Sequence, residues 1–124
     1  MRDAVQPANA PKPAGPYSPG VRAGDIVFVS GQTGTDPDTG AFVPGGVREQ
    51  ARQALQNALN VVEAAGLSPR NVVKATIYLT DMNDFAAVNA EYATFFEAPY
   101  PARTTIAVAG LPLGARVEVE LIAR

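Results

Sequence analysis

The stretch VREQARQALQNALNVVEAAG, residues 47–66, sets the fold class because its apolar residues recur every three or four positions. That spacing places them on one face of a helix about five turns long, and most charged and amide residues fall on the other face. Gly66 ends the pattern, because glycine readily takes the left-handed conformation that follows a helix. The apolar face consists of Val47, Ala51, Ala54, Leu55, Ala58, Leu59, Val62 and Ala65.

The period changes from helical to alternating on the C-terminal side of this helix. NVVKATIYLTD, residues 71–81, alternates apolar and polar residues, which predicts a strand. Its apolar face is expected to carry Val73, Ala75, Ile77 and Leu79. The next segment, DFAAVNAEYATFFEA, has an apolar stripe at helical spacing (Phe85, Val88, Tyr92 and Phe95) and predicts a second helix.

The remaining elements are strands. DIVFVSG, residues 25–31, is a β-branched and aromatic run, and a Pro- and Ala-rich arm over residues 1–20 precedes it. Two strands near 103–109 and 115–122 flank AGLPLGA, which favours an antiparallel pair. The order β-β-α-β-α-β-β, with a further short strand possible in the arm, predicts one domain over 1–124 of the α/β class. We expect its helices on one face of a mixed sheet.

Composition excludes several chemistries. The chain has no histidine and no cysteine, which rules out zinc sites built from those ligands and both Ser-His-Asp and Cys-His catalysis. We therefore expect neither a metal nor an organic cofactor. Ten cationic residues are dispersed against twelve acidic ones, so no nucleic-acid partner is expected. No apolar segment could span a bilayer and no signal peptide is evident, so a cytoplasmic location is expected.

The charged residues that most strongly indicate a functional site lie on the last two predicted strands. Alternation, with a tight turn near 111–113, predicts that Arg103, Thr105, Glu118 and Glu120 share one face of the sheet. These charges could be an exposed ion pair, which contributes ~0 to 1 kcal/mol. Alternatively, because two helices leave one face of the sheet uncovered, another subunit could cover the charges there. The hairpin alone leaves both readings open.

Three stretches together resemble the RidA (YjgF) family over essentially the whole chain. They are GPYSPGVRAGDIVFVSGQ (15–32), FAAVNAEYATFF (85–96) and YPARTTIAVAGLPLGARVEVELIA (100–123). The resemblance implies a chorismate-mutase-like fold and a homotrimer with inward-facing sheets and ligand sites between subunits. It also implies hydrolysis of 2-iminopropanoate and 2-iminobutanoate, which PLP enzymes release when they dehydrate serine or threonine. The products are a 2-keto acid and ammonia.

The resemblance also implies roles for individual residues. Arg103 matches the arginine that binds the substrate carboxylate, and its guanidinium offers a planar fork to two oxygens. Glu118 matches the glutamate assigned to the catalytic water, although alternation alone does not separate it from Glu120. The other matching residues would line the site or lie beside the ligand: Tyr17, Ser30, Gly31, Asn89 and Thr105. Thr105 replaces a cysteine common in the family, at a position that contributes mainly backbone contacts.

Two other functions compete with imine hydrolysis. A non-catalytic trimer could bind small carboxylates through Arg103 without using Glu118. Ribonuclease activity or translation inhibition is a weaker alternative, because the chain is slightly acidic and has no histidine for acid-base cleavage.

Overall fold

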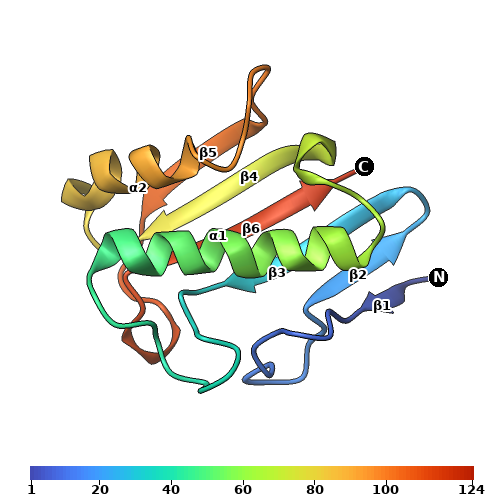
Figure 1. Ribbon diagram of the computed structural model, residues 1–124, viewed down its shortest axis with the longest axis horizontal. Coiled ribbons are helices and arrows are strands. Elements are labelled where there is room, and N and C mark those ends of the chain that lie inside the picture. The colour runs from blue at the N-terminus through green and yellow to red at the C-terminus, as the bar shows by residue number, and fades with distance from the viewer.

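The computed structural model describes residues 1–124 and consists of one six-stranded sheet with two helices on one face (Figure 1). The helices are α1 (Val47–Ala64) and α2 (Phe85–Tyr92). The strands are β1 (Asp3–Val5), β2 (Gly20–Ala23), β3 (Ile26–Gln32), β4 (Val72–Leu79), β5 (Ala102–Ala107) and β6 (Val117–Ala123). Short 3-10 turns occupy Pro69–Asn71, Met82–Asp84 and Pro112–Gly114. The predicted α/β class and element order are confirmed, with β1 as the further strand in the arm.

The strand order across the sheet is β1-β2-β3-β6-β4-β5, so β1 and β5 form the two edges. Only β4 and β5 are parallel, and α2 is the crossover that joins them. All other neighbours are antiparallel. The sheet is therefore mixed, as the sequence predicted.

The core lies between α1 and the central strands. Val27, Ile77, Leu79, Val117 and Val119 are fully buried on the sheet side and meet the apolar face of α1. The start of α1 is fixed by Glu49, whose carboxylate accepts a hydrogen bond from the Gly46 backbone N–H at 2.8 Å. Its end is fixed by Gly66, which has φ +82°. The predicted helix is thus confirmed, with the expected face buried.

The predicted antiparallel pairing of the last two strands is wrong. β6 does not pair with β5 but inserts between β3 and β4, and β4 separates it from β5. The physical reason is burial: Val117, Val119, Leu121 and Ala123 are all at most 1% exposed, which only a central strand under α1 allows. The connection over residues 108–116 passes the end of β4, where Val108 N–H donates to Leu79 O at 2.8 Å.

The predicted common face for the charges is also wrong. In the parallel β4–β5 register, Arg103 lies beside Ala75 and Thr105 beside Ile77, whose side chains are buried under the helices. Glu118 lies beside Tyr78 on the opposite face, and Glu120 lies beside Thr76 there. Alternation within each strand was correct, but the relation between the strands depended on a pairing that does not form.

Two smaller differences concern apolar side chains. Val73 is 49% exposed instead of facing the core, because the β4–β6 register shifts between Val72 and Lys74 and Val72 is buried instead. The second helix ends at Tyr92, earlier than its apolar stripe suggested. Beyond that end, Phe96 is more deeply buried than Phe95. None of the helices is both long and apolar enough to cross a membrane.

Candidate functional site

Arg103 is held in place by three side chains of α2. Its Nη2 donates a hydrogen bond to Asn89 Oδ1 at 2.7 Å. Its guanidinium carbon lies 4.7 Å from the centroid of the Tyr92 ring and 5.7 Å from that of Phe85. Phe85, Asn89 and Tyr92 are four and three residues apart, so they lie on one face of the helix. We call Arg103, Asn89, Phe85 and Tyr92 the arginine group.

The arginine group contains a cation without a counter-ion. Arg103 is half-buried, and it forms none of the four ion pairs in the chain. Cation–π contacts hold the plane of a guanidinium while leaving its remaining N–H groups free to donate. Two further hydroxyls on this side of the sheet, those of Tyr92 and Thr105, are buried and have no hydrogen-bond partner. Burial raises the pKa of Tyr92, which stays a neutral phenol near neutrality.

Glu118 belongs to a second group of residues near the ends of β3 and β6. It lines a cavity of about 260 Å³ together with Tyr17 and Gly31. Gly31 allows the carboxylate to come close, since a Cβ at this position would lie only 2.6 Å from Glu118 Oε1. Ser30 supports this arrangement by donating its hydroxyl to the Ser18 carbonyl at 2.6 Å, which ties the N-terminal arm to β3. We call Glu118, Gly31 and Tyr17 the glutamate group.

The structure distinguishes the two glutamates that alternation could not separate. Glu120 accepts a short hydrogen bond from the Tyr78 hydroxyl, which, with burial, raises the pKa of Tyr78 to about 12. Glu118 has no side-chain hydrogen bond, and burial, with a smaller effect of the Glu120 charge, raises its pKa above the usual range. Glu118 is therefore the carboxylate that is free to act in a cavity, and Glu120 is the one already engaged.

The two groups do not meet within one chain. β4 lies between Arg103 on β5 and Glu118 on β6, so their backbones are about 10 Å apart at the usual strand spacing. Their side chains also leave opposite faces of the sheet. Of the residues predicted for the site, the structure brings Tyr17, Gly31 and Glu118 together, with Ser30 beside them, and separately Asn89 and Arg103, with Thr105 on the same face.

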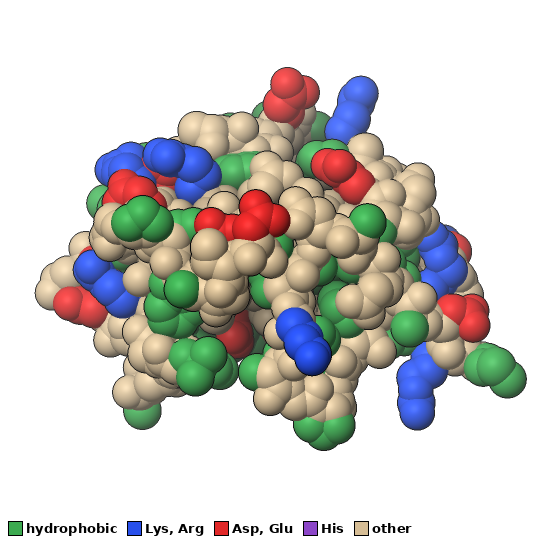
Figure 2. All heavy atoms as spheres, turned by 60° about the horizontal axis from the view of Figure 1, so that its bottom comes forward, with side chains coloured by type: hydrophobic (Ala, Val, Ile, Leu, Met, Phe, Trp, Pro, Cys, Tyr) green, Lys and Arg blue, Asp and Glu red, His purple; other side chains and the backbone are tan.

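Phe85 and Tyr92 were not predicted as partners of Arg103. Both belong to the apolar stripe that was predicted for the second helix. Their spacing from Asn89 could have suggested a shared face, but only the crossover of α2 over β5 brings that face onto the arginine. On the face shown in Figure 2, cationic and acidic side chains are interspersed, and the one row of adjoining cationic side chains, at the upper left, lies next to acidic ones.

Comparison with known proteins identifies the family. The model of the family described as endoribonuclease L-PSP matches residues 7–124. The chain belongs to this family, which includes RidA. A mouse protein named 2-iminobutanoate/2-iminopropanoate deaminase is 48% identical to this RidA-family chain over 123 residues, covering 99% of the chain and 91% of the mouse protein.

Solved structures of RidA-family proteins share the fold closely. A crystal structure of Escherichia coli TdcF with bound serine is 43% identical with a TM-score of 0.93, and covers 98% of this chain and 97% of its own. A structure of RidA from an Antarctic Psychrobacter is 41% identical with a TM-score of 0.93, covering 98% of both chains. The family resemblance found in the sequence is confirmed.

Proposed function

We propose that this protein hydrolyses 2-imino acids such as 2-iminopropanoate and 2-iminobutanoate to 2-keto acids and ammonia. The observation that carries the proposal is Arg103, a half-buried guanidinium positioned by an amide and two rings and paired with no carboxylate of the chain. A substrate carboxylate is the natural partner of such a planar donor. The names of the mammalian relatives support this substrate class.

The proposed site forms between subunits. Because the arginine and glutamate groups lie on opposite faces of one sheet, a small substrate can contact both only if the glutamate group comes from a neighbouring copy. We therefore propose a homotrimer in which the uncovered sheet faces turn inward. The uncovered face carries apolar side chains that water solvates poorly, since Phe28 is 44% and Ile106 42% exposed in the single chain.

The proposed reaction needs only water and the side chains of the two groups. Arg103 holds the carboxylate and orients C2, and Glu118 accepts a proton as water adds to C2. Protonated Glu118 passes this proton to the imine nitrogen, which gives the neutral carbinolamine. Glu118 then relays the proton of the carbinolamine hydroxyl to the amino nitrogen, and the C–N bond breaks as the C=O group forms, releasing ammonia. Because the imine is already reactive, orientation supplies most of the acceleration.

The first experiment generates 2-iminopropanoate with a serine dehydratase and follows its loss. We expect Arg103→Ala and Glu118→Gln each to abolish the acceleration, while Arg2→Ala, which removes an exposed cation outside the cavity, retains it. If Arg103→Ala accelerates hydrolysis like the unmodified protein, the assignment of Arg103 is wrong. Binding of 2-ketobutyrate without turnover of several imines would instead identify a non-catalytic carboxylate-binding module.

Mixed trimers test the shared site directly. When Arg103→Ala and Glu118→Gln chains are refolded together in equal amounts, about one quarter of inter-subunit sites would combine both intact groups in a symmetric ring. We expect activity to return to about that fraction, although each variant alone is inactive. No recovery in particles that sediment at three times the 12.9 kDa chain mass would show that both residues act within one chain.

The remaining expectations from sequence stay part of the proposal: a cytoplasmic location, no cofactor and no nucleic-acid partner. Cleavage of single-stranded RNA by the purified protein, lost in Arg103→Ala, would replace imine hydrolysis with the ribonuclease alternative.

A further inference from the structure

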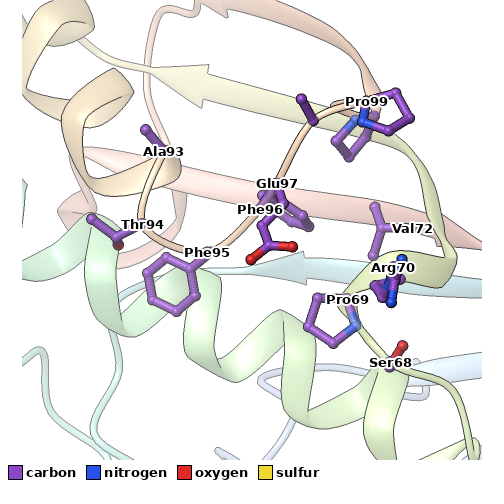
Figure 3. A pocket seen from close by; sticks show the side chains of 12 residues that line it. Ser68, Pro69, Arg70, Val72, Ala93, Thr94, Phe95, Phe96, Glu97 and Pro99 are labelled. Carbon is purple, nitrogen blue, oxygen red and sulfur yellow. The ribbon is translucent and has the colours of Figure 1, made fainter.

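A cavity of about 710 Å³ lies away from both groups of the proposed site. One wall is formed by residues 68–72, at the start of β4, and the other by residues 93–101, which connect α2 to β5 (Figure 3). We call it the connector cavity. Its volume lies within the ~300 to 1,000 Å³ range of small-molecule sites.

The connector cavity combines a few buried apolar lining residues with stiff walls. Val72 and Phe96 are 5% and 6% exposed, and Phe95 is half-buried beside them. Three prolines fix the backbone φ angles of the walls: Pro69, Pro99 and Pro101. Because the walls of such a cavity are already ordered, little conformational entropy is lost when a ligand binds, and the ligand therefore binds more tightly.

Two opposite charges stand on the two walls. In Figure 3, Arg70 lies on the 68–72 wall and Glu97 on the connector. Neither forms an ion pair or a side-chain hydrogen bond, so their charged groups do not reach each other. The neighbouring hydroxyls are already engaged, since Ser68 Oγ lies 3.2 Å from Asn71 Oδ1 and Thr94 Oγ1 donates to Glu91 O at 2.7 Å.

We propose that the connector cavity binds a zwitterionic α-amino acid with a large apolar side chain. Arg70 would pair with its carboxylate and Glu97 with its ammonium group, as charge-assisted hydrogen bonds require. The long exposed side chains of both residues can close on a ligand from opposite walls. The apolar side chain would lie on Phe95 and Phe96, where burial of apolar surface and ring stacking both favour it. This site is separate from the proposed imine site.

Calorimetric titration of the full chain with L-phenylalanine tests the proposal. We expect saturable binding, and binding weaker by about tenfold or more for phenethylamine and for 3-phenylpropionate, which each lack one charge. Binding of either analogue as tight as that of the amino acid would overturn the recognition of a zwitterion. No saturation with L-phenylalanine up to its solubility limit would overturn the site itself.

Variants then locate the site. Arg70→Ala and Glu97→Gln should each weaken binding of L-phenylalanine by about tenfold or more, and Ala93→Trp, which fills the cavity, should abolish it. Arg2→Ala and Glu63→Gln remove exposed charges elsewhere and should change nothing. Loss of binding in Arg103→Ala but not in Arg70→Ala would place the ligand at the imine site and overturn the proposal. Because binding is measured without turnover, the result does not depend on deaminase activity.

Discussion

Gly31→Ala is predicted to disable the proposed site while leaving the fold intact. The new Cβ would lie 2.6 Å from Oε1, 2.7 Å from Cδ and 3.1 Å from Cγ of Glu118. To restore an ordinary contact of 3.4 Å, the carboxylate must retreat by about 0.8 Å. The atoms that collide are the far end of a flexible side chain, so Glu118 can move without displacing the strand.

Gly31→Ala is therefore expected to lower activity rather than stability. A misplacement near 1 Å in a catalytic group can lower the rate by about 10²-fold, so we expect a loss of that order in kcat/KM for imine hydrolysis. The free energy of unfolding should change by less than about 1 kcal/mol in urea denaturation. Gly110→Ala is the matched control, because no atom lies within 4 Å of its added Cβ.

A double-mutant cycle shows whether the loss acts through Glu118. If it does, Gly31→Ala should have almost no further effect on the residual rate of Glu118→Gln, because the displaced group is already inactive. Wild-type activity in Gly31→Ala, or a full additional loss in the Glu118→Gln background, would show that the added methyl group does not act through Glu118.

Three further predictions concern charge and packing. Because the Glu120 charge contributes to the raised pKa of Glu118, Glu120→Gln should shift the acidic limb of the kcat/KM–pH profile to lower pH; a shift to higher pH would contradict this. Arg52→Ala removes the two hydrogen bonds of 3.0 and 3.1 Å that lower the pKa of buried Glu91, so it should lower the free energy of unfolding at pH 7. This difference, measured by urea denaturation, should shrink as pH falls below 4.5 and Glu91 becomes protonated; a constant difference would contradict the charge effect. Gly34→Ala places a Cβ 2.6 Å from a backbone atom of α1 and should lower stability by about 1 to 3 kcal/mol relative to Gly110→Ala, measured in the same way.

The raised pKa of Glu118 also predicts how its ionisation changes the thermal stability of the protein. Its folded-state pKa is raised, so the unfolded chain releases this proton first as pH rises above 4.5, and the folded state loses stability through that window. Glu118→Gln is therefore expected to melt at a higher temperature than the unmodified protein at pH 7, with the difference vanishing near pH 4. Equal melting temperatures at pH 7 would mean that the Glu118 carboxylate is fully solvated in the folded protein.

The elements of the fold were predictable because their signals are local. Helical spacing over residues 47–65 and alternation over 71–81 report which side of a segment is apolar, and both elements form within a residue or two of their predicted bounds. Single candidates for the site, such as Arg103 and Glu118, could also be chosen from the sequence, because each lies in a stretch that resembles the family.

The order of the strands in the sheet could not be predicted from patterns within single segments of the sequence. Two apolar runs around AGLPLGA look like a hairpin, yet β6 gains more burial in the middle of the sheet, where α1 covers Val117, Val119 and Leu121. Which strands pair depends on how much surface each alternative buries across the whole chain, and that is a property of the folded core.

The amino-acid sequence was sufficient to predict the helices and strands, to exclude histidine and cysteine chemistry, and to suggest residues for a site. That Arg103 lies under α2, stacked on Tyr92, while Glu118 faces the other side of the sheet beside Gly31, follows from the folded chain alone. The reason is that the face of a strand is read from its own sequence, whereas its direction and neighbours are set by contacts between segments far apart in the chain.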